Sequence, residues 1–220
     1  MPHTLDTLDH AYQAASTEGL LIVVSGPSAV GKDTVLDALL SAPDLPHAIE
    51  KCVTATTRPP REMEKDGIDY HFVTPAQFND MVAHDALLEY AEVHNHWYGT
   101  PRSWVLERRR KGIDVILKID VQGGLTVKKA SHDAVLVFLR PPSLDELERR
   151  LRHRATESEN DIARRLLNAR SELANLCRYD YAVTNDDVME TVAHIRAILM
   201  AEHCRIQRLG RRTEDMDYGS

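Results

Sequence analysis

The chain has 220 residues, of which 43% are hydrophobic and 28% are charged, and its formal net charge is −7 at pH 7. This length fits one compact domain with a sizeable insertion, and the composition excludes a disordered or low-complexity chain. The acidic balance disfavours a general affinity for nucleic acid, and no apolar run approaches the ~18 residues that would span a membrane.

The cysteines and the first residues bear on the cellular compartment. Cys52, Cys177 and Cys204 are an odd count without CxxC spacing, which argues against a disulfide framework and against a zinc site. The first nineteen residues hold no Lys or Arg and no apolar stretch, so we expect neither a signal nor a transit peptide. These features favour a cytoplasmic protein.

Strands alternate with helices along much of the chain. Leu20–Val24 is a short apolar run rich in β-branched residues, and the Gly-bearing segment Ser25–Gly31 separates it from a helical pattern over Thr34–Leu40. Two further buried strands are predicted at Asp114–Ile119 and Ala134–Leu139, each followed by a helix-length pattern. The alternation predicts an α/β fold with a parallel sheet and helices on both faces.

The segment between Cys52 and Thr100 has a different texture and is predicted to be an inserted lobe. Aromatic residues concentrate there, and Pro59, Pro60 and Gly67 interrupt it. We expect short strands near 70–73 and 87–93, on either side of a small helix. The start of that helix is predicted from its N-cap, first-turn proline and capping glutamine, which are Thr74, Pro75 and Gln77.

The carboxyl-terminal part returns to longer elements. Ser143 followed by Glu146 matches a capping box and predicts a helix that runs to about Leu151. Beyond it we expect a helix over about 160–177, a strand near 181–183 and a final helix over about 187–208.

The segment Gly26-Pro27-Ser28-Ala29-Val30-Gly31-Lys32, called the phosphate loop below, fits the pattern GxxxxGK. The predicted strand before it and the helix after it are the context in which this pattern binds nucleotides. Its glycines let backbone N–H groups point inward, the helix N-terminus adds partial positive charge, and Lys32 neutralises phosphate oxygens. The loop therefore predicts a site for a nucleoside triphosphate.

The position after Lys32 departs from the pattern. A Ser or Thr hydroxyl for Mg²⁺ is usual there, but this chain has Asp33 and then Thr34. A carboxylate beside polyphosphate is repulsive unless a divalent cation lies between them. We hypothesise that Asp33 holds the magnesium, directly or through water. The alternative is that Asp33 points away and caps the start of the helix.

Residues of the inserted lobe suit a purine monophosphate. Arg58 and Arg61 precede a strand that carries Tyr70, and two guanidinium groups with a phenol suit a phosphate monoester. Glu89 comes later in the lobe. A carboxylate can accept the paired N–H donors of the guanine edge, which adenine lacks.

With these three blocks in order, the chain resembles the guanylate kinases over about residues 20–199. The third block is Arg149 to Glu159 followed by Arg164-Arg165-Leu166, which is similar to the mobile lid of that family. The resemblance implies an α/β fold of the P-loop NTPase type, with a parallel sheet flanked by helices, an inserted mixed α/β lobe that binds GMP, and a short helical lid. The implied division is a core over 19–53, 101–149 and 167–208, a GMP-binding lobe over 54–100, a lid over 150–166, and terminal extensions 1–18 and 209–220.

The resemblance also implies roles for individual residues. Guanine would be bound by Thr54 and Glu89, with Thr100 in the same pocket and Asp120 facing the base. The phosphate of GMP would be held by Arg58, Arg61, Tyr70 and Tyr98. The ATP phosphates would be held by Gly26 to Asp33, Thr34 and the lid arginines Arg150, Arg154 and Arg165, with Asn185 near the adenine.

Two positions differ from the family pattern. Ala29 stands where the loop usually has its second glycine, a change that the backbone tolerates if φ stays negative. Lys118 stands where relatives often carry an acidic residue, and Asp120 matches the family aspartate two positions later.

The expected activity is transfer of the γ-phosphoryl group of ATP to GMP with Mg²⁺, and nothing in the sequence is placed to exclude dGMP. The acceptor phosphate is largely ionised at neutral pH, because its second pKa lies near ~6, so no catalytic base is needed. One alternative is a scaffold domain of the same fold that binds phosphopeptides, against which the intact Lys32 loop argues. Another is a kinase of a phosphorylated ribose, against which Glu89 and Thr54 argue. The expected partners are ATP and GMP, without nucleic acid or membrane, and a homo-oligomer is left open.

Overall fold

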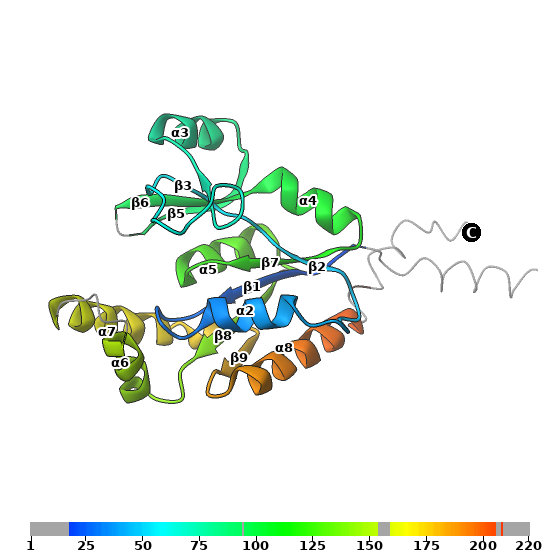
Figure 1. Cartoon of the computed structure of the whole chain (residues 1–220). Coiled ribbons are helices and arrows are strands. Elements are labelled where there is room, and N and C mark those ends of the chain that lie inside the picture. Colours follow the sequence, from blue (N-terminus) through cyan, green and yellow to red (C-terminus); the bar gives the residue numbers. More distant parts are fainter. Residues whose placement is uncertain (1–17, 94, 154–158, 206–207, 209–220) are drawn as a thin grey trace, which may run out of the picture.

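The computed structural model describes residues 18–93, 95–153, 159–205 and 208. A five-stranded sheet runs through its centre in the order β2-β7-β1-β8-β9, and all neighbouring strands are parallel (Figure 1). Ile22 of the central strand lies opposite Ile116 on one side and Val135 on the other. The strands are β1 (Leu21–Ser25), β2 (Ile49–Lys51), β7 (Asp114–Lys118), β8 (Val135–Arg140) and β9 (Tyr181–Thr184).

Both faces of this sheet are buried under helices. Leu20, Ile22 and Val24 pack into one core cluster with α2 (Lys32–Leu40) and α8 (Val188–His203). Leu21 and Val23 point the other way and pack with residues of α4 (Arg102–Arg110) and α5 (Val121–Ala130) (Figure 1). Because side chains on both faces are buried, the segment Leu20–Val24 is apolar at every position, as is typical of a strand in a parallel sheet.

The inserted lobe forms a second, mixed sheet in the order β4-β3-β6-β5, at the top of Figure 1. Strand β3 is parallel to β4 and antiparallel to β6, which also pairs antiparallel with β5. Its elements are β3 (Ala55–Thr56), β4 (His71–Phe72), α3 (Pro75–Ala83), β5 (Leu87–Val93) and β6 (His96–Pro101). The capping box predicted for the start of α3 is present, with reciprocal bonds between Thr74 and Gln77.

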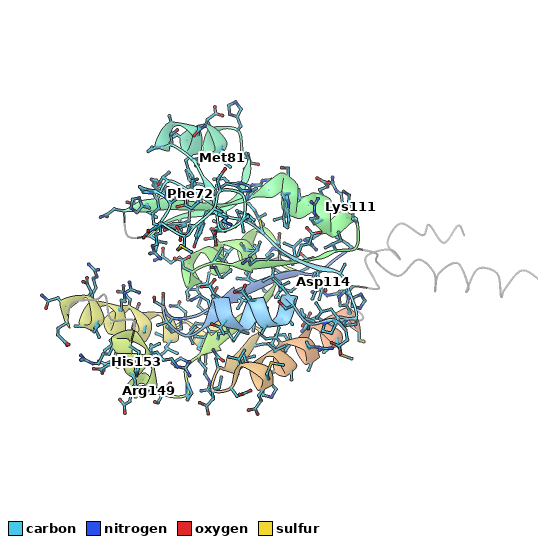
Figure 2. All side chains as sticks on the ribbon, viewed as in Figure 1. Phe72, Met81, Lys111, Asp114, Arg149 and His153 are labelled. Carbon is cyan, nitrogen blue, oxygen red and sulfur yellow. The ribbon has the colours of Figure 1, made fainter. Side chains whose placement is uncertain are left out.

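Two helices, α6 (Leu144–His153) and α7 (Glu159–Leu173), lie at one side of the core, where Figure 2 labels Arg149 and His153 on α6. The predicted start of α6 is confirmed in part, because the Ser143 hydroxyl accepts the backbone N–H of Glu146. The two helices pack on each other through a small apolar cluster that contains Leu147, Leu151 and Ile162.

Some predicted boundaries are wrong. The helix expected to reach 177 ends at Leu173, where the Asn175 side chain donates to the Ser171 carbonyl, and a short 3₁₀ turn follows over Leu176–Arg178. A side-chain amide that bonds the last turn competes with continuation of the helix. The last helix, α8, ends at His203 rather than near 208. No described helix has the length and apolarity needed to cross a membrane.

Candidate active site

A cavity of about 290 Å³ opens where the carboxyl ends of β1 and β7 face the inserted lobe. This edge of a parallel sheet is where α/β proteins usually bind ligands. Predicted donor-site and acceptor-site residues both line the cavity. Its lining residues are Gly26, Ser28, Lys32, Asp33, Thr54, Tyr70, Glu89, Ala91, Val93, Tyr98, Lys118, Ile119, Asp120 and Glu172.

The phosphate loop is held in shape largely by bonds to its own backbone. The Lys32 ammonium donates to the carbonyls of Gly26 at 2.5 Å and Pro27 at 3.0 Å. Burial lowers the pKa of Lys32 to about 8, an effect that the nearby Glu172 carboxylate opposes. Gly31 adopts a φ of 97°, and a Cβ there would lie 2.5 Å from Asn185 Nδ2. Glycine is therefore required at this position by both conformation and space.

Side chains from distant parts of the chain contact the same loop. Asn185 is buried and donates through Nδ2 to the Val30 carbonyl at 2.7 Å. Of the lid arginines, Arg150 Nη1 lies 3.4 Å from that carbonyl, and Arg165 Nη1 donates to the Ser28 hydroxyl at 2.8 Å. The structure thus brings two predicted lid arginines to the loop, whereas Arg154 lies outside the described residues.

The backbone of Ala29 does not meet the condition of a negative φ. Its φ is 65°, in the left-handed region, rather than negative. The loop therefore has the left-handed conformation that glycine adopts without strain, and for alanine this conformation costs roughly 1–2 kcal/mol.

Asp33 faces the cavity and is paired with a lysine. The Lys118 ammonium donates to its Oδ1, although 85 residues separate the two positions. Burial raises the pKa of Asp33, but the bond and charge of Lys118 outweigh this and leave that pKa below its usual value. Asp33 does not cap α2, because the N-cap residue of this helix is Gly31 and no described side chain caps it. The neighbouring Thr34 is exposed.

The two lobe arginines predicted to bind phosphate share one carboxylate. Arg58 donates through Nη2 to both oxygens of Glu64, at 2.8 and 2.9 Å, and its Nε lies 3.3 Å from the Tyr98 hydroxyl. Arg61 is exposed, and its backbone N–H donates to the same Glu64. The Arg58 guanidinium also lies 5.3 Å from the centre of the Tyr70 ring. A phosphate that binds here must either displace Glu64 from Arg58 or share the Arg58 guanidinium with it.

Glu89 lies buried at the base of the lobe side of the cavity. Its Oε1 accepts a 2.6 Å bond from Thr100, and burial raises the pKa of Glu89 to about 7, with the charge of Asp120 adding to the effect. Asp120 caps α5 by accepting the backbone N–H of Gly123 at 2.8 Å. A Cβ on Gly123 would lie 2.9 Å from Glu89 Oε2, so glycine lets α5 approach this carboxylate. Thr54 is also buried and lines the same cavity.

Comparison with known proteins identifies the family. The family model for guanylate kinase matches residues 18–202. The chain belongs to the guanylate kinase family. A curated guanylate kinase from Streptococcus pyogenes serotype M3 is 48% identical over 201 residues, which cover 91% of this chain and 94% of the relative. A solved guanylate kinase from Anaplasma phagocytophilum superposes with a TM-score of 0.73 at 32% identity, covering 91% of this chain and 95% of that one.

As a member of the guanylate kinase family, the chain is an enzyme that transfers a phosphoryl group from ATP to GMP. The phosphopeptide-binding and ribose-phosphate alternatives are not favoured.

Three residues in or near this cavity were not predicted to take part in a site. Lys118 reaches Asp33 only because β7 lies beside β1 in the sheet. Glu172 lines the cavity, and burial raises its pKa to about 7 against the opposing charge of Lys32. It stands seven residues after Arg165 on α7, a helical spacing that could have placed both on one face. Glu64 gave no signal, because nothing in its surroundings in the sequence marks it as the partner of Arg58.

Proposed function

We propose that the chain phosphorylates GMP with ATP in this cavity, the ATP phosphates lying on the phosphate loop and the guanine on Glu89. One observation carries the proposal: Lys32, which suits a polyphosphate, and Glu89, which suits a guanine edge, line the same cavity. Donor and acceptor can therefore meet without leaving the protein, and proximity of this kind contributes strongly to rate.

On the donor side, the loop amides from Gly26 to Lys32 and the N-terminus of α2 bind the ATP phosphates. Lys32 exchanges its bonds to loop carbonyls for phosphate oxygens. Arg150 and Arg165 already contact the loop, and with Arg154 we assign them to the γ-phosphoryl group when the lid, residues 150–166, closes. Asn185 holds the loop backbone, and we keep the proposal that it also lies near the adenine.

On the acceptor side, the lobe 54–100 binds GMP. The ionised Glu89 accepts the paired N–H donors of guanine, while the Thr100 hydroxyl donates to its Oε1 and Thr54 and Asp120 border the base. Adenine would leave this buried carboxylate unpaired, and discrimination of this kind reaches about 10⁴-fold. The phosphate of GMP is bound by Arg58, Arg61, Tyr70 and Tyr98, with Glu64 giving up its bonds to Arg58. We propose dGMP as an acceptor too, because nothing in the sequence is placed to exclude it.

The donor set suits Mg²⁺ held mainly by phosphates. Among the described residues, no group of three or more His, Cys, Asp and Glu side chains could hold a metal ion by itself. Mg²⁺ prefers hard oxygens and often takes only one or two carboxylates beside phosphates and water. Asp33 offers such a carboxylate: Lys118 bonds its Oδ1, and Oδ2 remains for the ion or for a bridging water. When bound, the ion neutralises charge on the β- and γ-phosphates.

The chemistry requires alignment and charge stabilisation. A phosphate oxygen of GMP forms a bond to the γ-phosphorus, the bond from that phosphorus to the β–γ bridging oxygen breaks, and ADP leaves with the electron pair. The attacking oxygen is already ionised, so no side chain removes a proton. Lys32 and the lid arginines stabilise the transferring group, and a closed lid keeps water from replacing GMP. ATP hydrolysis without GMP is therefore slow.

A coupled assay that compares GMP, AMP, UMP and a ribose bisphosphate as acceptors tests the proposal. We expect GDP formation that requires Mg²⁺, with AMP and UMP poorer acceptors by about 10³-fold or more. Purified protein that makes no GDP, or that phosphorylates the ribose bisphosphate faster, would contradict it.

We infer that the reaction belongs to purine nucleotide metabolism and takes place in the cytoplasm. Support for this compartment comes from the cysteines: Cys52, Cys177 and Cys204 are all free, which suits a reducing environment.

A further inference from the structure

Lys118 occupies a place in the cavity that none of the assigned roles explains. It is the last residue of β7, at the carboxyl end of the parallel sheet where the phosphate loop also begins. Its side chain is 23% exposed and lines the cavity. The strand fixes its backbone, so the ammonium group is delivered to this point by a rigid element of the core.

The Lys118 ammonium lies between the two halves of the site. On the donor side it bonds Oδ1 of Asp33, in the first turn of the helix that follows the phosphate loop. On the acceptor side it lies 5.9 Å from the centre of the Tyr70 ring, which belongs to the phosphate-binding part of the lobe. The other lysine of the described cavity lining, Lys32, bonds only carbonyls of the phosphate loop, so Lys118 is the lysine there that approaches both halves.

The hydrogen bond to Asp33 does not use all the donors of the Lys118 ammonium. An ammonium group has three N–H donors, and within the described part of the chain Asp33 is its one hydrogen-bond partner. Donors therefore remain for an anion that enters the cavity.

We propose that Lys118 binds the phosphate of the acceptor nucleotide and holds it against the donor, with Asp33 as the positioning residue that aims the ammonium. This inference rests on the proposed function. Two polyanions repel each other where they meet, and a fixed cation at that point offsets the repulsion. Lys32 binds the phosphates of ATP alone, whereas Lys118 lies where the phosphates of the two nucleotides meet.

Binding experiments without ATP or Mg²⁺ isolate this contact. The affinities of GMP and of guanosine, which lacks the phosphate, are measured by calorimetric titration of the full chain. Lys118→Met should weaken GMP binding by about 10- to 100-fold, the range expected for one charge-assisted hydrogen bond, and leave guanosine binding within about twofold. Lys118→Arg should keep GMP binding within a few-fold of the wild type.

Lys51→Met is the matched control. Lys51 also projects from a strand of the same sheet and pairs with an aspartate of α2, Asp37, at 3.9 Å, but it does not line the cavity. The Lys51→Met variant removes one positive charge beside α2, as Lys118→Met does, and we expect its GMP binding to equal that of the wild type. Equal weakening by Lys51→Met and Lys118→Met would show a diffuse electrostatic effect and overturn the proposal.

A double variant separates contact from charge masking. If Lys118 merely neutralised Asp33, then Asp33→Asn with Lys118→Met would restore wild-type affinity for GMP. We expect the double variant to stay at least about tenfold weaker than Asp33→Asn alone, because the phosphate contact is lost in either background.

The remaining outcomes are distinguishable. Wild-type protein that makes GDP while Lys118→Met binds GMP as tightly overturns this inference alone. Equal losses for GMP and guanosine also overturn it, because they indicate damage to the lobe. Wild-type protein that makes no GDP overturns the proposed function and this inference together.

Discussion

The donor and acceptor halves of the cavity are prepared for their ligands in different ways. The phosphate loop is fixed by backbone geometry, by Lys32 on its own carbonyls and by Asn185 on Val30. The acceptor lobe instead satisfies its charged groups with one another, as in Arg58 with Glu64. Under the proposed function, ATP meets a backbone cradle that is already formed and exchanges the bonds of Lys32 to loop carbonyls, whereas GMP must break an ion pair between two charged side chains of the lobe.

This difference assigns affinity and selectivity to different halves. A preformed backbone cradle binds any triphosphate, because amide N–H groups contact no base. Under the proposed function the lobe selects, because the buried Glu89 and the paired Arg58 gain new partners only when both base and phosphate fit. Changes in the donor half should therefore affect rate with every acceptor, and changes in the lobe should affect GMP specifically.

Lys32→Met breaks the donor half most severely. We expect kcat to fall about 10³-fold or more, because the variant loses the cation that neutralises charge on the transferring group. Steady-state assays with saturating GMP measure this, and circular dichroism checks the fold. Lys111→Met, which removes an exposed lysine paired with Glu107 on α4, should keep full activity. Retention of kcat in Lys32→Met would contradict the assignment of the loop.

Glu89→Gln tests the selectivity of the lobe. The amide replaces one acceptor oxygen with a donor that opposes the guanine N–H groups, so GMP affinity should fall about 10²-fold or more. Affinity for an ATP analogue should not change. Glu92→Gln, at an exposed position of the same strand, is the control and should bind GMP normally. An equal loss of ATP-analogue binding would mean that the lobe does not act independently.

The raised pKa of Glu89 makes guanine binding pH-dependent. Because burial raises this pKa from 4.5 to about 7, the folded protein binds an extra proton between these values. The contribution of this proton on Glu89 to the free energy of unfolding is therefore complete below about pH 4.5 and is lost as pH rises through about 7. Guanine needs the ionised form, so guanosine affinity should rise about tenfold between roughly pH 6 and 8.

Guanosine is the probe for that titration because the phosphate of GMP itself titrates near ~6. Burial also raises the pKa of Glu172 to about 7, so the measurement is repeated in Glu172→Gln. A guanosine affinity that does not vary with pH in either protein would contradict the role of Glu89.

Glu64→Gln removes the internal competitor of the acceptor phosphate. The Arg58 guanidinium then exchanges weaker bonds when GMP binds, and GMP affinity should rise about two- to fivefold. Titration calorimetry measures the change, and Glu62→Gln, at an exposed position nearby, should have no effect. Weaker GMP binding in Glu64→Gln would show that Glu64 positions Arg58 rather than competing for it.

Ala29→Gly probes the fixed geometry of the donor half and has the smallest effect. Glycine accepts the φ of 65° without strain, so the free energy of unfolding should rise by about 0.5–1 kcal/mol after allowing for the freer unfolded chain. Ala38→Gly, within α2, should lower it by about 1 kcal/mol. Denaturant unfolding measures both, and a destabilised Ala29→Gly would indicate a loop that relaxes rather than one held under strain.

The sequence predicts local features of this molecule better than meetings between distant segments. The phosphate loop, the doubly buried β1 and the capped start of α3 are encoded within a few residues each, and the structure contains all three. Strand β3 has two residues, too few for any periodicity to be visible. The pairs Asp33 with Lys118 and Arg165 with Ser28 depend on sheet order and helix docking, which no local pattern encodes.

A crystal structure of the protein with GMP tests the central claim most directly. The account predicts that the Glu89 carboxylate accepts two N–H donors from the guanine edge, with the phosphate bound by Arg58 and facing the phosphate loop. A guanine base bound away from Glu89, with that carboxylate still bonded only to Thr100, would contradict it.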